Sequence, residues 1–351
     1  MLMAWGFCEA GQGLAWLAVG VAVVLVFVLV LLLALSIDAR WGEPLPAVHP
    51  VVLMGRYLQV CGDVISACSP AVAFAGGALA WLAGVLVVGA LTAALQALTL
   101  YQVTQLVLAP GLDKAAIAAL LVLAMGWLLK CMLSWRMLHD EVGAVETALQ
   151  QSVETGRARL AWLVSRNTAL LSESEVRESA IESLAENLND SVVAPVFWFV
   201  LFGLPGAAIY RFANTADAMW GYRGVHRGQH WEWAGKWAAR ADDVLSWLPA
   251  RLTAGLLALA VRGLPVAALR WEAAKTPSPN SGWPMAAMAL ALGVSLRKPG
   301  VYTLNAAGRP AESADTASAQ KYASQAVFAL VLFAKSAMFS IAVACFASLS
   351  P

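Results

Sequence analysis

Two clusters of acidic, amide and arginine residues flank a strongly apolar stretch in the second half of this 351-residue chain. In the first cluster acidic residues recur at every fourth position, and they are Glu178, Glu182, Glu186 and Asp190. In a helix this spacing places the four carboxylates in one stripe, where they repel one another. The stripe therefore needs a cation over it, either a divalent metal or an arginine, or a freely solvated face.

The second cluster places Arg211, Asn214 and Asp217 at successive i+3 positions, on one face of a helix, among apolar residues such as Phe212 and Met219. Polar groups set into apolar sequence indicate a site. A run of acids on a helix commonly faces water, which is the structural alternative. However, the acidic stripe leads directly into the apolar stretch, where unpaired carboxylates are costly without a cation or a watery cavity.

Composition identifies the class of protein that must position these side chains. The chain is 60% hydrophobic and 13% charged, with a mean hydropathy of +0.69, whereas soluble domains are roughly 45–50% apolar and about 25% charged. This composition predicts an integral membrane protein. The net charge of +1 and the lack of a basic run exclude a nucleic-acid partner. Five scattered cysteines without a CxxC pair are predicted to be small core residues.

The apolar segments predict an all-α fold, a polytopic integral membrane helical bundle in a single domain over residues 1–351. Segments of about 20 apolar residues are long enough to span a bilayer, and they lie near 14–35, 72–98, 115–133, 244–268 and 326–346. Arg40 and Arg56 follow the first of them, which places its C-terminal end in the cytoplasm. We therefore expect a multi-pass protein of the cell inner (cytoplasmic) membrane.

The stretch 191–210 also has the length of a span, but a single crossing would separate the two polar clusters that flank it. Pro195, Gly203 and Pro205 can break a helix there, and irregular backbone is tolerated at membrane depth where protein or a watery cavity covers it. We therefore predict a re-entrant or broken helix that brings both clusters to the cytoplasmic side.

The remaining segments carry further polar residues. The proline-rich segment 38–56 is predicted to be a loop at a membrane exit, and its Asp38, Glu43 and His49 belong either to a polar site or to a loop solvated by lipid headgroups. Residues 139–164 are predicted to form an amphipathic cytoplasmic helix, 275–284 a rigid loop, and 297–321 a mobile loop or lid. His226 and His230, at i and i+4, indicate either two metal ligands or an interfacial helix.

Several short blocks occur in a fixed order from residue 38 to near residue 296. The first blocks are Asp38, Gly42-Glu43-Pro44, His49-Pro50-Val51, Met54-Gly55, Glu182-Ser183, Ala185-Glu186-Asn187, Asp190 and Ala194-Pro195. The later blocks are Pro205-Gly206-Ala207, Tyr210-Arg211, Asn214-Thr215, Asp217, Gly221-Tyr222, Ala239-Arg240, Asp242-Asp243, Pro249-Ala250-Arg251 and Ser278-Pro279-Asn280-Ser281-Gly282-Trp283-Pro284. With this ordered set the chain resembles the CbiB/CobD family of cobalamin-biosynthesis membrane proteins, the adenosylcobinamide-phosphate synthases.

The chain also departs from the pattern of that family. Glu43 stands where an aspartate is usual, Asn167 where an Arg-Asp-Thr block has its aspartate, and Thr276 where a histidine precedes the Pro-Ser-Pro-Asn block. Arg297-Lys298-Pro299-Gly300 replaces a glycine-rich tract. Glu43 keeps a carboxylate, but Asn167 removes a charge, so no catalytic role is assigned to it.

The resemblance implies a carbon–nitrogen ligase. It would use ATP to join a propionate of adenosylcobyric acid, a corrinoid, to 1-amino-2-propanol or its O-phosphate, giving adenosylcobinamide (phosphate). ATP would enter as co-substrate with Mg²⁺, and no Walker-A sequence is present. The lipid bilayer and other late membrane enzymes of the pathway are the further expected partners.

The same resemblance, joined to the chemistry of the side chains, nominates the site residues. The expected catalytic residues are Glu186, Asp190, Asp217 and Asn214, with Glu186 and Asp190 as ligands of Mg²⁺. Arginine suits bidentate binding of phosphate, and carboxylates and amides would orient polar groups. The expected substrate- and nucleotide-binding residues are Asp38, Glu43, His49, Glu182, Asn187, Arg211, Arg240, Asp242, Asp243, Arg251, Lys275 and Asn280.

Two other functions stay open from the sequence. A secondary transporter also contains broken helices with intramembrane carboxylates, but it would show paired, repeat-related interruptions, which this chain lacks. A non-catalytic membrane signalling or sensor protein could keep the fold of the family without its activity. Consumption of ATP only in the presence of both corrinoid and amine would distinguish the ligase from both.

Overall fold

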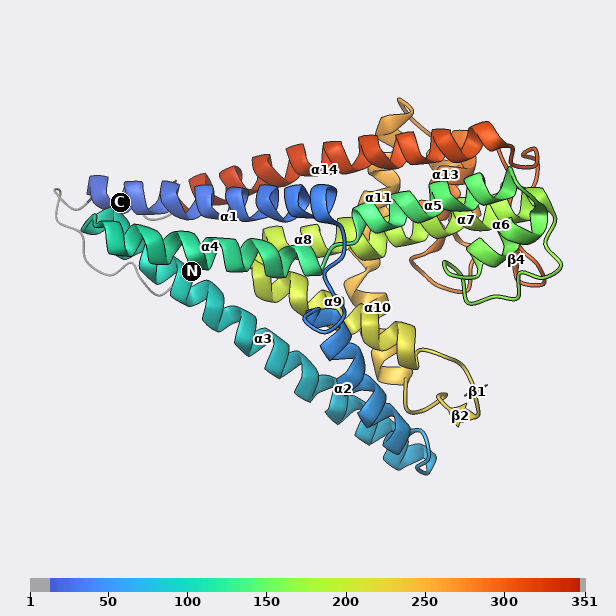
Figure 1. The fold of residues 1–351 in the computed structure, drawn as a ribbon, viewed down its shortest axis with the longest axis horizontal. Coiled ribbons are helices and arrows are strands. Elements are labelled where there is room, and N and C mark those ends of the chain that lie inside the picture. Colours follow the sequence, from blue (N-terminus) through green and yellow to red (C-terminus); the bar gives the residue numbers. More distant parts are fainter. Residues whose placement is uncertain (1–12, 348–351) are drawn as a thin grey trace.

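The computed structural model describes residues 13–347 and is built almost entirely of helices (Figure 1). In chain order the elements are α1 Gly13–Trp41, α2 Pro50–Ile65, α3 Pro70–Leu108, α4 Leu112–Cys131, α5 Trp135–Leu149, α6 Val153–Leu160, α7 Glu173–Leu188, a π-helix Asn189–Val193, α8 Ala194–Phe202, α9 Leu204–Trp220, β1 Val225–His226, β2 Gln229–His230, α10 Lys236–Leu245, α11 Trp247–Ala260, α12 Val266–Ala273, α13 Gly282–Leu292, β3 Leu296–Lys298, β4 Tyr302–Leu304 and α14 Ser313–Ala347. Each pair of short strands forms an antiparallel hairpin.

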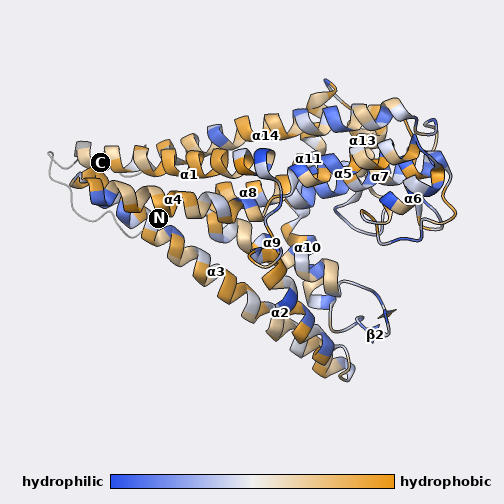
Figure 2. Cartoon of the chain, viewed as in Figure 1, coloured by the Kyte–Doolittle hydropathy of each residue, from blue (hydrophilic) through white to orange (hydrophobic). Residues whose placement is uncertain are grey.

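The long helices gather at one end of the molecule and the short helices at the other. Helices α1, α4 and α14 lie side by side, and α3 is inclined to them and leads back to α2 (Figure 1). The long helices are mostly hydrophobic, while hydrophilic residues concentrate around α5, α6 and α7 (Figure 2). The fold is therefore the predicted all-α, polytopic membrane bundle.

Four helical segments are long and apolar enough to span a membrane, and they are Ala15–Trp41, Pro70–Leu108, Leu112–Leu149 and Ser313–Ile341. A fifth candidate is the pair α10 and α11, which is bent by 45° at its break. The segment 244–268 overlaps this pair but is not one helix, because α11 ends at Ala260. The chain then turns through Gly263, which has a φ of +123°, and Pro265 precedes α12.

The apolar stretch 191–210 forms a broken helix. Pro195 has no N–H to donate to the Ser191 carbonyl four residues back, and that carbonyl instead accepts a hydrogen bond of 3.1 Å from Ser134 N–H. Helix α8 ends at Gly203, whose φ of +71° suits glycine. Helix α9 then packs alongside α8, with the Leu204 N–H donating to the Gln96 side chain at 2.8 Å. The chain therefore folds back on itself within this stretch.

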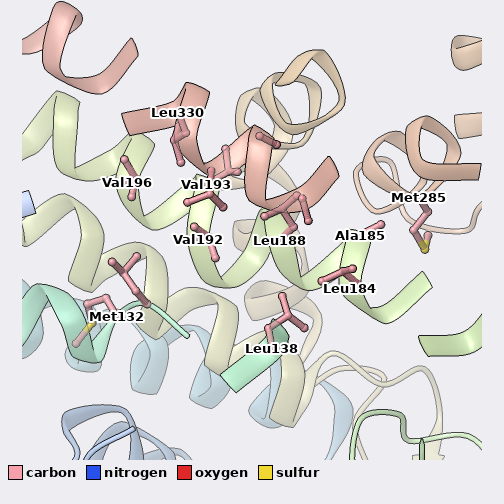
Figure 3. Close-up of a cluster of buried hydrophobic side chains, with 14 of the residues drawn as sticks. Met132, Leu138, Leu184, Ala185, Leu188, Val192, Val193, Val196, Met285 and Leu330 are labelled. Carbon is pink, nitrogen blue, oxygen red and sulfur yellow. The ribbon is translucent and has the colours of Figure 1, made fainter. Parts of the chain in front are cut away.

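Buried side chains of α7, the π-helix and α8 form the centre of the core. In Figure 3 Leu184, Leu188, Val192 and Val196 follow this segment, with Leu330 of α14 and Met132 close by. Small residues let the helices approach one another. A Cβ added at Gly84 of α3 would overlap the ring of Phe212 of α9. The position of α9, which carries the second polar cluster, thus depends on close packing with α3.

Three local expectations need correction. Residues 139–164 form two helices, because α5 ends near Gln150 and the Ser152 side chain caps α6. The segment 297–321 is not one loop, since β3 and β4 pair and α14 begins at Ser313. His226 and His230 lie on the β1–β2 hairpin and not on a helix, and the His226 ring stacks on Tyr222.

The cysteines only partly match their predicted core role. Cys131 is buried, Cys61 is half-buried and Cys68 is exposed, and all three thiols are free. Cys8 and the side chain of Cys345 lie outside the described residues.

Candidate functional site

The first two acids of the stripe on α7 are neutralised by arginines from elsewhere in the chain. Arg297 of β3 binds Glu178 with two hydrogen bonds of 2.8 Å. Arg166 forms an ion pair with Glu182, whose Oε1 also accepts a hydrogen bond of 2.6 Å from the Tyr302 hydroxyl of β4. These contacts hold the β3–β4 hairpin and the loop before α7 against one half of the stripe.

The last two acids of the stripe, Glu186 and Asp190, have no ion-pair partner within residues 13–347. Burial and the negative charges of Asp190 and Glu182 raise the pKa of Glu186 to about 7. The positive charges of Lys298 and Arg166 lower this pKa, but by less than burial raises it. A cation at this position would therefore find two neighbouring carboxylates that form no salt bridge with the described side chains.

Asp190 lies on the π-helix, a rare element that is frequent at functional sites. The Ala194 N–H donates to the Asn189 carbonyl five residues back, which widens the helix by one residue at this point. The side chain of Asn189 donates to Asp190 Oδ1 at 2.7 Å and accepts from the Thr253 hydroxyl of α11 at 3.1 Å. Asn189 therefore links Asp190 of the π-helix to α11.

The second polar cluster, on α9, faces the same carboxylate. Arg211 donates to Ser191 at 3.2 Å, and its buried Nε has no hydrogen-bond partner among residues 13–347. The Asn214 amide donates to Asp242 Oδ1 of α10 at 3.4 Å. Burial, with the charges of Asp190 and Asp243, raises the pKa of Asp217 to about 6. The folded-back α8–α9 segment therefore brings the two clusters together.

A network of charged side chains lies where α1 and α4 end, and its members are Lys130, Asp38, Glu43 and His49. Lys130 and Asp38 are each 1% exposed, and the Lys130 ammonium is 3.5 Å from Asp38 and 3.0 Å from Glu43. His49 binds Glu43 at 2.9 Å through Nε2, while its Nδ1 accepts from the Val51 N–H and caps α2. Although burial opposes it, hydrogen bonds from His49 and Lys130 hold the pKa of Glu43 below its usual value.

Arg251, Asn280 and Asp243, three of the expected binding residues, connect α11, the loop before α13 and α10. The Arg251 guanidinium lies over the rings of Trp247 and Trp283 and donates to Asn280 Oδ1 at 3.0 Å. Asn280 in turn donates to the Asp243 carbonyl at 2.7 Å. Arg251 and Asn280 therefore fix the end of α10 that carries Asp242 and Asp243, and their own polar groups are used within the protein.

Three other expected binding residues, Lys275, Asn187 and Arg240, form no hydrogen bond or ion pair with the acids and Arg211 of the two polar clusters within residues 13–347. Lys275 is bound to Glu272 with two contacts of 2.7 Å. The Asn187 amide donates to the Ser183 carbonyl within α7. Arg240 of α10 is exposed and has no ion pair within residues 13–347.

Sequence reasoning missed several residues of this site. Lys130 is a lone charge inside the predicted span 115–133, a pattern that is itself a signal of a functional or structural site. Arg166, Asn189, Lys298 and Tyr302 gave no comparable signal, because their partners are set by tertiary contacts.

The described residues contain no group of three or more His, Cys, Asp or Glu side chains that could by itself hold a metal ion. A complete zinc-type site is thus not present between residues 13 and 347, either at His226 and His230 or among the acids. Mg²⁺ is usually bound through one or two carboxylates together with water and substrate phosphates. The pair Glu186 and Asp190, which has no salt bridge among the described residues, fits that requirement.

The high pKa of Glu186 leads to a testable pH dependence. Its pKa is about 7 in the folded protein against 4.5 in the unfolded chain, so between these pH values the folded state binds more protons. Stability contributed by the protonated carboxyl is therefore lost as pH rises from about 4.5 to 7. We expect Glu186→Gln to unfold at a higher temperature than the parent at pH 8 in EDTA and detergent, with the difference shrinking towards pH 5.

The matched control for this measurement is Glu154→Gln on the exposed first turn of α6, which should unfold like the parent at both pH values. A lower unfolding temperature of Glu186→Gln at pH 8 would mean that the carboxylate has a stabilising partner in the protein.

Comparison with known proteins gives consistent matches. The family model described as CobD/Cbib protein matches residues 31–331. A probable cobalamin biosynthesis protein CobD of Thermococcus kodakarensis is 42% identical over 76% of this chain and 82% of its own length. The corresponding protein of Methanothermobacter thermautotrophicus is 36% identical over 85% and 92%. Cobalamin biosynthesis protein CobD of Chromobacterium violaceum is 40% identical over 75% and 78%. No solved structure matches the chain.

Proposed function

Because this chain belongs to the CobD/Cbib protein family, whose named relatives are cobalamin biosynthesis proteins, we propose that it is an ATP-dependent carbon–nitrogen ligase of cobalamin biosynthesis. It joins a propionate carboxyl of adenosylcobyric acid to the amine of 1-amino-2-propanol or its O-phosphate. The observation that supports this most directly is the pair Glu186 and Asp190, which forms no salt bridge within the described residues and lies near Arg211, whose Nε has no hydrogen-bond partner there.

The chemistry requires activation of the carboxylate, which is a poor acyl donor. The propionate oxygen attacks the γ-phosphorus of ATP, the bond to the β-phosphate oxygen breaks, and ADP leaves. The neutral amine then attacks the acyl phosphate, an amide bond forms, and phosphate leaves with the carboxyl oxygen it received. The amine gives up one proton in this step.

The described side chains divide into an acidic half and a basic half that suit this reaction. Glu186 and Asp190 would hold Mg²⁺, which neutralises phosphate charge when bound. Arg211, from the folded-back α9, would donate its unpaired Nε to a phosphate or carboxylate oxygen. Asn214 and Asp217 would orient polar groups of the substrates, and the network of Lys130 fixes the loop that contains Glu43 beside Arg211.

The proposed function is tested by supplying the purified protein with ATP, corrinoid and amine together and then omitting each in turn. ATP should be consumed only in the complete mixture. With ¹⁸O in the propionate carboxyl, the label should appear in the released phosphate. Label in AMP would indicate adenylation instead, and absence of any amide product would favour a non-catalytic sensor of the same fold.

The β3–β4 hairpin supplies a further cation for the phosphates. Lys298 pairs across the hairpin with Tyr302, so the two side chains share a face, and the Tyr302 hydroxyl lies on Glu182, one helical turn from Glu186. Lys298 is half-buried and forms no ion pair within the described part of the chain. We expect Lys298→Met to raise the KM for ATP about tenfold, the order of one charge-assisted hydrogen bond.

Two control variants accompany the measurement of the KM for ATP. Lys298→Arg keeps the charge and should recover most of the affinity, while Lys321→Met removes an exposed lysine of α14 and should change nothing. An unchanged KM in Lys298→Met would exclude the hairpin from nucleotide binding.

The two polar clusters are proposed to face the cytoplasm, where ATP is available. Leu170, before α7, is 91% exposed and Val225, after α9, is 59% exposed, so cysteines at these two positions are accessible to a reagent. In a cysteine-free background of intact cells, an impermeant thiol reagent should label neither, and both should react after the membrane is opened. Labelling of one position from outside would place the two flanks of α8–α9 on opposite sides of the membrane.

A further inference from the structure

An apolar cavity of about 440 Å³ lies between α2, α3, α4 and α9, apart from the acidic group. Its lining is almost entirely aliphatic, aromatic or methionine side chains. The lining residues are Pro50, Leu53, Met54, Tyr57, Ala83, Gly84, Val87, Val88, Leu91, Thr92, Leu128, Met132, Leu204, Ala208 and Phe212.

The polar side-chain groups of the lining are already satisfied. The Tyr57 hydroxyl donates to the Ala80 carbonyl at 2.7 Å, and the Thr92 hydroxyl donates to the Val88 carbonyl at 2.7 Å. A buried water needs two to four polar partners, and apolar cavities without them stay dry. The cavity therefore has little to hold water, and an apolar occupant would recover dispersion contacts that its walls otherwise lack.

The cavity is continuous with the surface that faces lipid. Only 11% of the most apolar window of the α3 span is buried within the protein. Of the lining residues themselves, Leu53 of α2 is 52% exposed, and Val87 and Leu91 of α3 are 59% and 68% exposed. Contiguous apolar surface of this kind on a membrane bundle is covered by acyl chains.

We propose that this cavity is a binding site for one acyl chain of a bilayer phospholipid, which lies among α2, α3, α4 and α9 as a structural ligand. The site does not depend on the proposed ligase activity. Phe212 lines the cavity, and its neighbour Arg211 lies in the polar group. A chain in the cavity would therefore support the position of α9 from the lipid side.

The test reconstitutes the full chain in nanodiscs that contain a phosphatidylcholine with a photoreactive diazirine near the end of one acyl chain. After irradiation, peptide mapping should find label on Met54 and Met132, which are 8% and 2% exposed and are out of reach of lipid that only surrounds the protein. Label restricted to exposed residues such as Leu86 would overturn the proposal.

Matched variants on α3 sharpen the result. Val87→Trp fills the mouth of the cavity, and Leu86→Trp adds the same ring at a similarly exposed neighbour that does not line it. Val87→Trp should lower the label on Met54 and Met132 at least fivefold, on the order of a loss of about 1 kcal/mol of binding, and Leu86→Trp should not. Equal labelling in both variants would contradict the site.

A second measurement needs no variant, in case Val87→Trp fails to fold. Excess decane should compete with the acyl chain and lower the label on Met54 and Met132 while leaving Leu86 labelled. Decane without effect would overturn the proposal. Loss of label on adding corrinoid alone would assign the cavity to the substrate, and crosslinks between two chains in place of lipid would assign it to a second copy.

Discussion

Asp190→Asn should reduce ligation by about a hundredfold to a thousandfold, the order observed when a group that stabilises transition-state charge is removed. The amide keeps the shape of the side chain and can still bond to Asn189, which now donates to Asp190 Oδ1 at 2.7 Å. What it loses is the negative charge beside Glu186, and with it one of the two uncompensated carboxylates proposed to hold Mg²⁺. The rate should be measured at saturating ATP over a range of Mg²⁺ concentrations.

Binding of Mg²⁺-ATP, followed by calorimetry, should weaken in the same variant, while its unfolding temperature in detergent stays at or above that of the parent. Asp113→Asn, which removes an exposed aspartate from the first turn of α4, is the matched control and should ligate normally. Near-normal turnover of Asp190→Asn with unchanged dependence on Mg²⁺ would place the end of the stripe outside the site.

Lys130→Met should destabilise the folded protein by about 3–5 kcal/mol, the usual result of removing one partner of a buried ion pair. Lys130 is 1% exposed and lies 3.0 Å from Glu43 and 3.5 Å from Asp38. Without its ammonium group, the buried Asp38 and the partly buried Glu43, which keeps its hydrogen bond to His49, both lose the positive charge of Lys130. We expect a low yield of folded protein and a lower unfolding temperature in detergent.

A double variant separates charge from packing in this experiment. Lys130→Met combined with Glu43→Gln leaves only Asp38 charged, and that carboxylate still accepts a hydrogen bond of 2.8 Å from the Arg136 N–H. It should therefore recover part of the lost stability. Lys114→Met at the other end of α4 removes only a hydrogen bond of 2.9 Å to the Ala109 carbonyl and should have a small effect. Equal losses of stability in Lys130→Met and Lys114→Met would mean that the ion pairs of Lys130 do not stabilise the fold more than an exposed hydrogen bond does.

The membrane fold could be predicted from the sequence because long apolar runs and helix-breaking residues are local signals. The runs near 14–35, 72–98, 115–133 and 326–346 coincide with the long helices. Pro195 and Gly203 indicated the break that lets α9 pack back along α8. Over 244–268 the apolar composition continues through a turn at Gly263, so the sequence did not indicate where α11 ends.

At the site, helical spacing predicted which residue types share one face of α7 and of α9, because this spacing is a local property. Which of the acids have no ion pair depends on contacts between distant segments. Glu178 is paired with Arg297, 119 residues away, and Glu182 with Tyr302, 120 residues away, so these two are removed from the stripe as candidates for a metal. The π-helix that turns Asp190, and the burial of Lys130 between Asp38 and Glu43, depend likewise on packing against other helices. The partners that compensate a charge in a membrane bundle are neighbours in space, and the spacing of residues along the chain does not predict them.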